Sequence, residues 1–359
     1  MIPRSEIWSI LDEYDVKQIT IATICSHSAL QIFHGAKIEG FRTLGICLEN
    51  RKRVYSAFPK AKPDILIEVN AFSELLSENL QKELIEKNCI VVMHGSFIEY
   101  IGAKNILDYF RVPTYGNRIS LIWESNRKMQ IKWLKEAKLR TPKEYESIND
   151  AKGWVFVKLH GAKGGKGYFV AKAEELEKEL KARNMSAKDV IIQEYVVGQR
   201  YYLHFFYSPI ETEGLKVGSG RLELLSMDRR IETIDEIYRT LPHIIPDYMD
   251  FTVSGNIPII LRESLLAEAI GMGAKVVKAS QKLFPPGIIG PFCLETSYHP
   301  DKGFTVFEIS ARIVAGTNLY PTGSPYTPYI FNEPMSTGRR IAREIRKAVE
   351  IGKLKEIVY

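Results

Sequence analysis

The chain has 359 residues, which is too long for one ordinary hydrophobic core, so two or three lobes are expected. Hydrophobic residues make up 45% and charged residues 26%, as in ordinary globular proteins, and no apolar run is long enough to span a bilayer. The net charge of +6 suits anionic ligands such as nucleotides, although ordinary surface lysines explain it equally well; without a dense basic block, the sequence does not predict nucleic-acid binding.

Residues 1–117 alternate between strand-like and helix-like segments. Four apolar, β-rich runs predict strands, at residues 18–24, 42–49, 64–69 and 89–97. Ser26 is expected to cap a helix that runs toward Gly40, and residues 73–87 are expected to form another helix. This alternation predicts a parallel sheet with helices on its faces.

Two of these predicted strands end in similar polar turns, SHS at residues 26–28 and HGS at residues 94–96. Ligands of parallel sheets gather beyond the carboxyl ends of the strands, where helix N-termini attract phosphate. Each turn alone is more simply explained as a helix cap. Together, the two turns favour a shared anion-binding site.

From residue 118 onward the pattern changes to α+β. Helices are expected at residues 118–140, 173–183, 263–282 and 338–354. Strands are expected at residues 189–208 with a break at Gly198, 222–234, 251–261, 290–298 and 303–313. The last two strands should form an antiparallel pair.

A glycine-rich hairpin is predicted at residues 157–170, which read VKLHGAKGGKGYFV. The segment does not match a P-loop, and a strand rather than a helix follows its glycines, so it is not a dinucleotide fingerprint either. Glycines let the backbone approach phosphates while lysines neutralise them. Protein kinases use a similar flap, but HRD and DFG are absent here. A phosphate-covering loop is therefore predicted, with a ligand-free mobile hairpin as the alternative.

Three further features surround this hairpin. Lys158 precedes the loop, and QEYVV at residues 193–197 has the pattern of an adenine-binding hinge. Glu295 and Glu308 lie on the two strands of the predicted antiparallel pair, so their carboxylates could lie side by side. Two carboxylates together with nucleotide phosphates suit Mg²⁺. Solvated strand charges are the alternative for each glutamate, but their apolar neighbours favour the metal role.

In chain order, Arg127 and the motifs VKLHGAKGGKGYF, QEYVVG, CLET and FEISAR resemble the ATP-grasp superfamily of carboxylate–amine ligases, over roughly residues 118–350. Stretches such as SHSALQIFHGAKIEGF, VMHGSFIEYIG and SGNIPIILRESLL are similar to the archaeal formate-dependent ligases of purine synthesis, the FAICAR synthetases. The resemblance implies an α/β pre-ATP-grasp domain with a parallel βαβ sheet, followed by a two-lobed α+β ATP-grasp domain. The expected boundaries are 1–117 and 118–359, with a small lobe at 118–192 and a large lobe at 193–359.

The resemblance also implies an activity. Such an enzyme is an ATP- and formate-dependent carbon–nitrogen ligase that converts AICAR, an aminoimidazole carboxamide ribonucleotide, to FAICAR through formyl phosphate in IMP biosynthesis. ATP and Mg²⁺, or Mn²⁺ in its place, are implied, as is a homo-oligomer. Four scattered cysteines without a C-x-x-C pair and a start without an apolar signal segment predict a cytoplasmic protein with reduced thiols and no membrane or nucleic-acid partner.

The resemblance assigns site residues by position. ATP would be bound by Arg127, Lys158, Gly161, Gly164, Gly165, Gly167, Glu194, Tyr195, Val196, Val197 and Glu232. The ribonucleotide would be bound by His27, Ser96 and Asn256, and the metal by Glu295 and Glu308. Lys158 and Arg312 are the expected catalytic residues, with Arg312 neutralising charge near the transferred phosphoryl group. Asn256 could instead simply form a turn, and Glu232 could be a solvated charge.

The chain departs from the superfamily pattern in three places. Ser310 stands where many ATP-grasp enzymes have asparagine, and residues 198–200 lack the usual acidic ribose contact; both departures favour the formate-dependent subfamily. Residues 313–318 read IVAGTN, where an acidic residue and two glycines are expected before Thr-Asn. This change leaves open a paralogous ligase with another acid or amine, or a non-catalytic nucleotide-binding protein.

Overall fold

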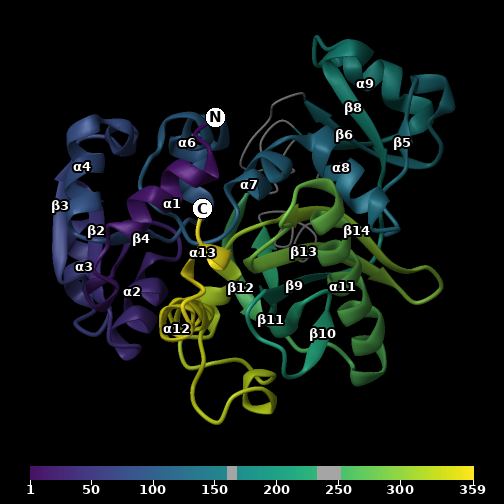
Figure 1. Cartoon of the computed structure of the whole chain (residues 1–359). Coiled ribbons are helices and arrows are strands. Elements are labelled where there is room, and N and C mark those ends of the chain that lie inside the picture. Colours follow the sequence, from purple (N-terminus) through teal and green to yellow (C-terminus); the bar gives the residue numbers. More distant parts are fainter. Residues whose placement is uncertain (160–167, 233–251) are drawn as a thin grey trace.

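The computed structural model describes residues 1–159, 168–232 and 252–359 (Figure 1). Within these residues the chain forms three sheets, with strand orders β3-β2-β1-β4, β5-β8-β6-β7 and β10-β11-β9-β13-β14, the last with β12 paired to β11. The predicted combination of a parallel α/β sheet with α+β lobes is confirmed. No helix among the described residues has the length and apolar character needed to cross a membrane.

The first sheet is parallel, as predicted. Its strands are β1 (Thr20–Ile24), β2 (Arg42–Leu48), β3 (Ile65–Val69) and β4 (Cys89–Val91). The helices of this region are α1 (Arg4–Asp12), α2 (Ala29–Ile38), α3 (Lys52–Ala57), α4 (Glu78–Glu86), α5 (Gly95–Tyr100) and α6 (Ala103–Tyr109). The apolar runs form strands because helices cover both faces of the sheet, which leaves β1 buried along its whole length.

Two local predictions in this region are wrong. Ser28, not Ser26, occupies the N-cap position of α2, and the Ser26 hydroxyl instead accepts a hydrogen bond from Arg51 at 2.6 Å. The expected helix at residues 73–87 is divided, because the Ser77 side chain caps α4 and separates it from a short 3₁₀ turn.

The turn after β4 also differs from the prediction. The strand ends at Val91, and the polar residues that follow begin helix α5. His94 is the N-cap residue, and its ring nitrogen accepts a hydrogen bond from the Ser96 N–H at 3.3 Å. The predicted polar turn is therefore a helix N-terminus at the carboxyl edge of the parallel sheet.

The second sheet is small and antiparallel, and α9 (Leu176–Ala182) covers it. Its strands are β5 (Glu144–Tyr145), β6 (Trp154–Leu159), β7 (Tyr168–Lys172) and β8 (Val190–Glu194). Strands β6 and β7 form the predicted hairpin, and the residues between them lie outside the described part of the chain. The proposed lobe boundary at residues 192 and 193 falls within β8, and the division into domains stays a prediction.

The third sheet is the largest and is antiparallel. Its strands are β9 (Gln199–Ser208), β10 (Leu215–Val217), β11 (Gly220–Glu232), β12 (Val253–Pro258), β13 (Gly290–His299) and β14 (Gly303–Ser310). Helices α8 (Arg127–Glu136) and α11 (Leu266–Leu283) pack on one face, where Phe205 joins the core that includes Trp133. The next residue, Phe206, points to the other face, as strand alternation requires.

Helix α12 (Thr337–Glu350) joins the parallel sheet to the large sheet (Figure 1). A side chain at Gly35 of α2 would lie 2.2 Å from the Arg339 backbone nitrogen, and one at Gly338 would lie 2.3 Å from the Gln31 carbonyl oxygen. The two helices therefore cross in near backbone contact. This crossing holds α2, and with it the carboxyl end of β1, against the large sheet. The remaining helices are α7 (Arg118–Ser125) and α13 (Leu354–Ile357).

Candidate active site

A pocket of about 450 Å³ opens between the small sheet and the large sheet. Its volume lies in the range of small-molecule sites in proteins. The predicted residues that line it are Arg127, Lys158, Glu194, Tyr195, Val196, Glu232, Glu295 and Glu308. Val197 is not part of the lining and is 64% exposed, while Gly161, Gly164, Gly165 and Gly167 lie outside the described residues.

Glu295 and Glu308 lie directly opposite each other on β13 and β14, which confirms the predicted placement of the two carboxylates side by side. A bulge follows this pair, with Thr296 paired to Val306. Glu308 faces the pocket, and desolvation together with the charge of Glu295 raises its pKa to about 7. The described residues hold no cluster of three or more His, Cys, Asp or Glu side chains suited to a metal. Two carboxylates with phosphate oxygens fit Mg²⁺, which binds few protein ligands.

Lys158 lies across the pocket from these carboxylates, on β6. Desolvation and the nearby Arg127 lower the pKa of Lys158 to about 8, while Glu308 acts in the opposite direction. Arg127 is the first residue of α8, and its guanidinium donates a hydrogen bond to the Tyr168 hydroxyl at 3.1 Å. Both cations are therefore held near one another by separate elements, which suits a group carrying several negative charges.

The charge of Lys158 gives a pH dependence that can be measured. Above about pH 8 the ammonium loses its proton, so ATP affinity should fall, approaching about tenfold per pH unit. Lys158→Arg keeps its charge over this range and should show no such fall. Calorimetric titration with a non-hydrolysable ATP analogue between pH 7 and pH 10 measures the affinity of the wild-type protein and of Lys158→Arg. An equal decline in the two proteins would remove Lys158 as the cause.

The predicted adenine hinge connects β8 to β9. The N–H groups of Glu194 and Tyr195 donate to the carbonyls of Lys143 and Trp154, at 2.7 and 3.0 Å. In the part of the chain that the structure describes, the N–H groups of the next two residues, Val196 and Val197, bond no backbone carbonyl. The hinge N–H groups that remain for a purine are therefore those of Val196 and Val197.

His27 and Ser96 meet at the carboxyl edge of the parallel sheet. The His27 ring stacks on His94 with centroids 5.2 Å apart, and the Ser96 hydroxyl donates to Ser26 at 2.9 Å. Desolvation, His94 and the nearby Arg312 and Arg230 lower the pKa of His27 well below its ordinary value. His27 is thus neutral at physiological pH and able to accept or donate a hydrogen bond.

Asn256 lies on the large sheet and belongs to the same region. Its amide donates to Asp228 at 2.6 Å, and Asp228 also pairs with His204. A side chain at Gly316 would lie 2.2 Å from the Asp228 carboxylate, so glycine is required there. Asn318, in the same short turn, donates to the His27 carbonyl at 3.1 Å. The unusual segment 313–318 therefore joins the two halves of the predicted ribonucleotide site.

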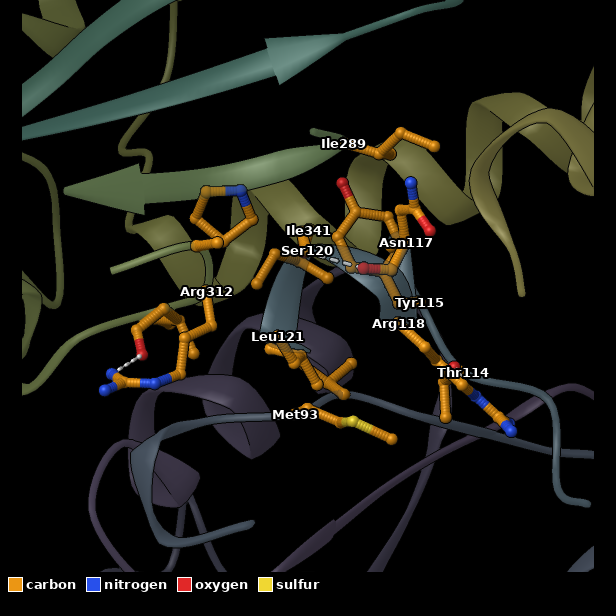
Figure 2. Close-up of a pocket in the computed structure, with 15 residues that line it drawn as sticks. Met93, Thr114, Tyr115, Asn117, Arg118, Ser120, Leu121, Ile289, Arg312 and Ile341 are labelled. Atoms are coloured by element: carbon orange, nitrogen blue, oxygen red, sulfur yellow. Dashed lines mark hydrogen bonds between the residues drawn. The ribbon is translucent and has the colours of Figure 1, made fainter. Parts of the chain in front are cut away.

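Arg312 follows β14 and lies beside His27. A side chain at Gly95 would lie 3.0 Å from the His27 ring nitrogen and 3.2 Å from the Arg312 guanidinium carbon. Behind Arg312 is a cavity of about 20 Å³, room for one water, lined in part by Met93, Tyr115 and Ile289 (Figure 2). This cavity is too small to hold a substrate.

Two functional candidates escaped the sequence reasoning. Glu124 on α7 pairs with Arg312 at 2.9 Å and accepts the Ala311 N–H at 2.8 Å. Burial raises the pKa of Glu124, while Arg312 acts to lower it. Arg230 on β11 forms two hydrogen bonds to Glu295 and lies 4.0 Å from the Tyr202 ring centroid. The sequence did hold a signal for Arg230. Residues two apart on a strand lie on the same face, so the assignment of Glu232 to the pocket would also have placed Arg230 there.

Known proteins resemble this chain along its whole length. Residues 21–145 match a family described as "Protein of unknown function (DUF1246)", and residues 168–359 match one described as "Domain of unknown function (DUF1297)". The 5-formaminoimidazole-4-carboxamide-1-(beta)-D-ribofuranosyl 5'-monophosphate synthetase of Korarchaeum cryptofilum is 55% identical, with 100% of both chains covered.

Solved structures agree with this relationship. The crystal structure of an IMP biosynthesis protein PurP from Thermococcus kodakaraensis is 34% identical, covers 94% of this chain and 100% of its own, and has a TM-score of 0.75. The ADP complex of an N5-carboxyaminoimidazole ribonucleotide synthetase is 16% identical, covers 91% of this chain and 77% of its own, and has a TM-score of 0.62, which shows a shared ATP-grasp fold. The chain therefore belongs to the family of 5-formaminoimidazole-4-carboxamide-1-(beta)-D-ribofuranosyl 5'-monophosphate synthetases.

Proposed function

We propose that this chain is an ATP-dependent ligase that joins formate to the aromatic amine of AICAR and so makes FAICAR for IMP biosynthesis. The observation that carries the proposal is the arrangement of one pocket. Glu295 and Glu308 face Lys158 across it, and the strand that bears Glu308 leads directly to Arg312 and the His27 edge. A nucleotide in the pocket would thus place its terminal phosphate beside a second substrate.

In the first step, a formate oxygen attacks the γ-phosphorus of ATP, and the bond from phosphorus to the β,γ-bridging oxygen breaks to release ADP. Lys158 and Arg127 would hold the phosphate oxygens, and this fixed positive charge costs no reorganisation during transfer. The hinge would hold the adenine, with Phe156 and Tyr195 among the aromatic lining. The product of the step is formyl phosphate, whose carbonyl carbon is far more electrophilic than that of formate.

In the second step, the AICAR amine attacks the formyl carbon, and the bond from that carbon to the phosphate oxygen breaks. The proton lost by the amine ends on the released phosphate, so the products are FAICAR, ADP and phosphate. Arg312 would neutralise the charge that develops on the leaving phosphate. His27, Ser96 and Asn256 would hold the ribonucleotide with its amine toward this point.

Glu295 and Glu308 would hold Mg²⁺, or Mn²⁺ in its place. The raised pKa of Glu308 beside Glu295 fits a pair of carboxylates that a cation stabilises. When bound, the metal neutralises phosphate charge.

We place the reaction in the cytoplasm, with small molecules as the substrates. The expected homo-oligomer stays a prediction that light scattering of the purified protein would test.

The test is an omission experiment. ADP release and FAICAR formation are measured with Mg-ATP, AICAR and formate, leaving out each in turn. The proposal expects both products only when all three substrates are present. ADP release with AICAR and a different acid would instead indicate a paralogous ligase, and ATP binding without turnover under any condition would indicate a non-catalytic nucleotide-binding protein.

A further inference from the structure

Arg230 lies where the nucleotide side and the ribonucleotide side of the site meet. On β11 it stands between Asp228, which Asn256 contacts, and Glu232, which pairs with Arg200. It is also the register partner of Asn256 on β12. Across the sheet it contacts Glu295. A group bound by Arg230 would therefore be next to the γ-phosphate and the amine at once, which is the position that the acid substrate must occupy.

The contact between Arg230 and Glu295 is a carboxylate-binding geometry. The two guanidinium nitrogens donate to the two carboxylate oxygens at 2.9 and 2.7 Å. This fork matches any carboxylate, because its two donors have the spacing of two carboxylate oxygens. Formate consists of these two oxygens, one carbon and one hydrogen, so a planar fork is the strongest recognition that it can receive.

The other cations of the site have different partners or positions. Lys158 lies on β6 of the small sheet and Arg127 donates to Tyr168 of β7, so both cations are beside the small sheet, where the phosphates are proposed. Arg312 is held by Glu124. Arg200 pairs with Glu232 at 2.5 Å. Of these three paired arginines, Arg230 is the one whose carboxylate partner, Glu295, is a proposed metal ligand.

We propose that Arg230 binds formate through both guanidinium N–H groups, and that the Glu295 carboxylate occupies this fork only until the metal–nucleotide complex draws it away. This inference rests on the proposed function. Glu295 keeps a positive partner in both states, Arg230 before nucleotide binding and the metal afterwards. The fork is vacated only in the second state, so formate binds after the nucleotide. The packing of Arg230 over Tyr202 keeps the guanidinium plane in place during this exchange.

The test is Arg230→Lys, which keeps the charge beside Glu295 but loses the fork. The KM for formate should rise by about tenfold or more, since a bidentate contact becomes a single one. The Kd for Mg-ADP, measured by calorimetry, and the KM for AICAR should change by less than about threefold, because the lysine still neutralises Glu295. The matched control is Arg229→Lys, the neighbouring residue on the same strand, which should leave all three constants unchanged. Should Arg230→Lys fold poorly, Arg230→Gln is used with the same expectations for formate.

A partial reaction separates this inference from the proposed function. Wild-type protein with ATP labelled at the β,γ-bridging oxygen should scramble the label only when formate is present, and Arg230→Lys should need correspondingly more formate. An unchanged KM for formate would overturn the role of Arg230 while the proposed function stands. Equal losses of formate binding and Mg-ADP binding would also overturn the role of Arg230 in formate binding, since Arg230 would then act only by neutralising Glu295. Label exchange in wild type that does not depend on formate would overturn the proposed function itself.

Discussion

Replacing Glu308 by glutamine should lower the rate of ATP turnover by roughly three orders of magnitude, because a metal ligand at the transferring phosphate contributes several kcal/mol to the transition state. Glutamine has the shape of glutamate but brings no charge to the metal. The substitution also removes a carboxylate that faces Glu295 and whose pKa is raised to about 7. Without metal, the variant should therefore melt at a temperature no lower than wild type at pH 8.

The measurement combines steady-state ADP release with thermal unfolding of the metal-free protein. Asp301→Asn is the matched control, because Asp301 lies in the turn between the same two strands and is highly exposed. That control should keep wild-type turnover. A Glu308→Gln protein that retains most of its activity would remove Glu308 from the proposed metal site, and a large loss of melting temperature would assign it a structural role instead.

Replacing Arg312 by alanine should lower kcat by about 10² to 10³, the usual cost of removing a group that stabilises charge in the transition state. The KM for ATP should change little, since Arg312 is not part of the nucleotide pocket lining. Glu124→Gln should lower kcat by a smaller factor, on the order of ten, because Glu124 positions the guanidinium without touching substrate.

The double variant Arg312→Ala with Glu124→Gln shows whether Glu124 acts by positioning Arg312 or independently of it. If Glu124 acts through Arg312, Glu124→Gln should have almost no further effect once Arg312 is alanine. Arg111→Ala, a substitution at an exposed arginine remote from the pocket, controls for loss of a surface charge. Fully additive effects of the two substitutions would show that Glu124 and Arg312 do not work as a unit.

The parts of the fold that could be predicted are those governed by neighbours in the sequence. Apolar runs separated by helices predicted the parallel sheet, and the short turn after His299 predicted the antiparallel pair that carries Glu295 and Glu308. The exact pairing of the two carboxylates depends on a bulge beside Glu295, because the register of the turn alone would place Phe307 opposite Glu295. The helix caps were less certain, because serine and histidine side chains compete for the same few N–H groups, and Ser26 contacts Arg51 instead.

The parts that could not be predicted depend on contacts between distant segments. Glu124 meets Arg312 only because α7 packs beside the end of β14, 188 positions later by sequence number. Arg230 is one of two adjacent arginines in MDRRIET, and the sequence does not distinguish between them. The partner of Arg230, Glu295, is 65 residues away. The role of segment 313–318 was equally hidden, since Gly316 and Asn318 contact Asp228 and His27 from a turn whose shape the sequence does not specify.

The formyl phosphate route transfers an oxygen atom from formate to the released phosphate. The proposed chemistry forms a bond between a formate oxygen and the γ-phosphorus and later breaks the carbon–oxygen bond on the other side of that atom. With ¹⁸O-labelled formate, AICAR and Mg-ATP, each released phosphate should carry one ¹⁸O, which mass spectrometry of the phosphate detects. Phosphate without the label, formed together with FAICAR, would contradict the formyl phosphate route and the role assigned to this pocket.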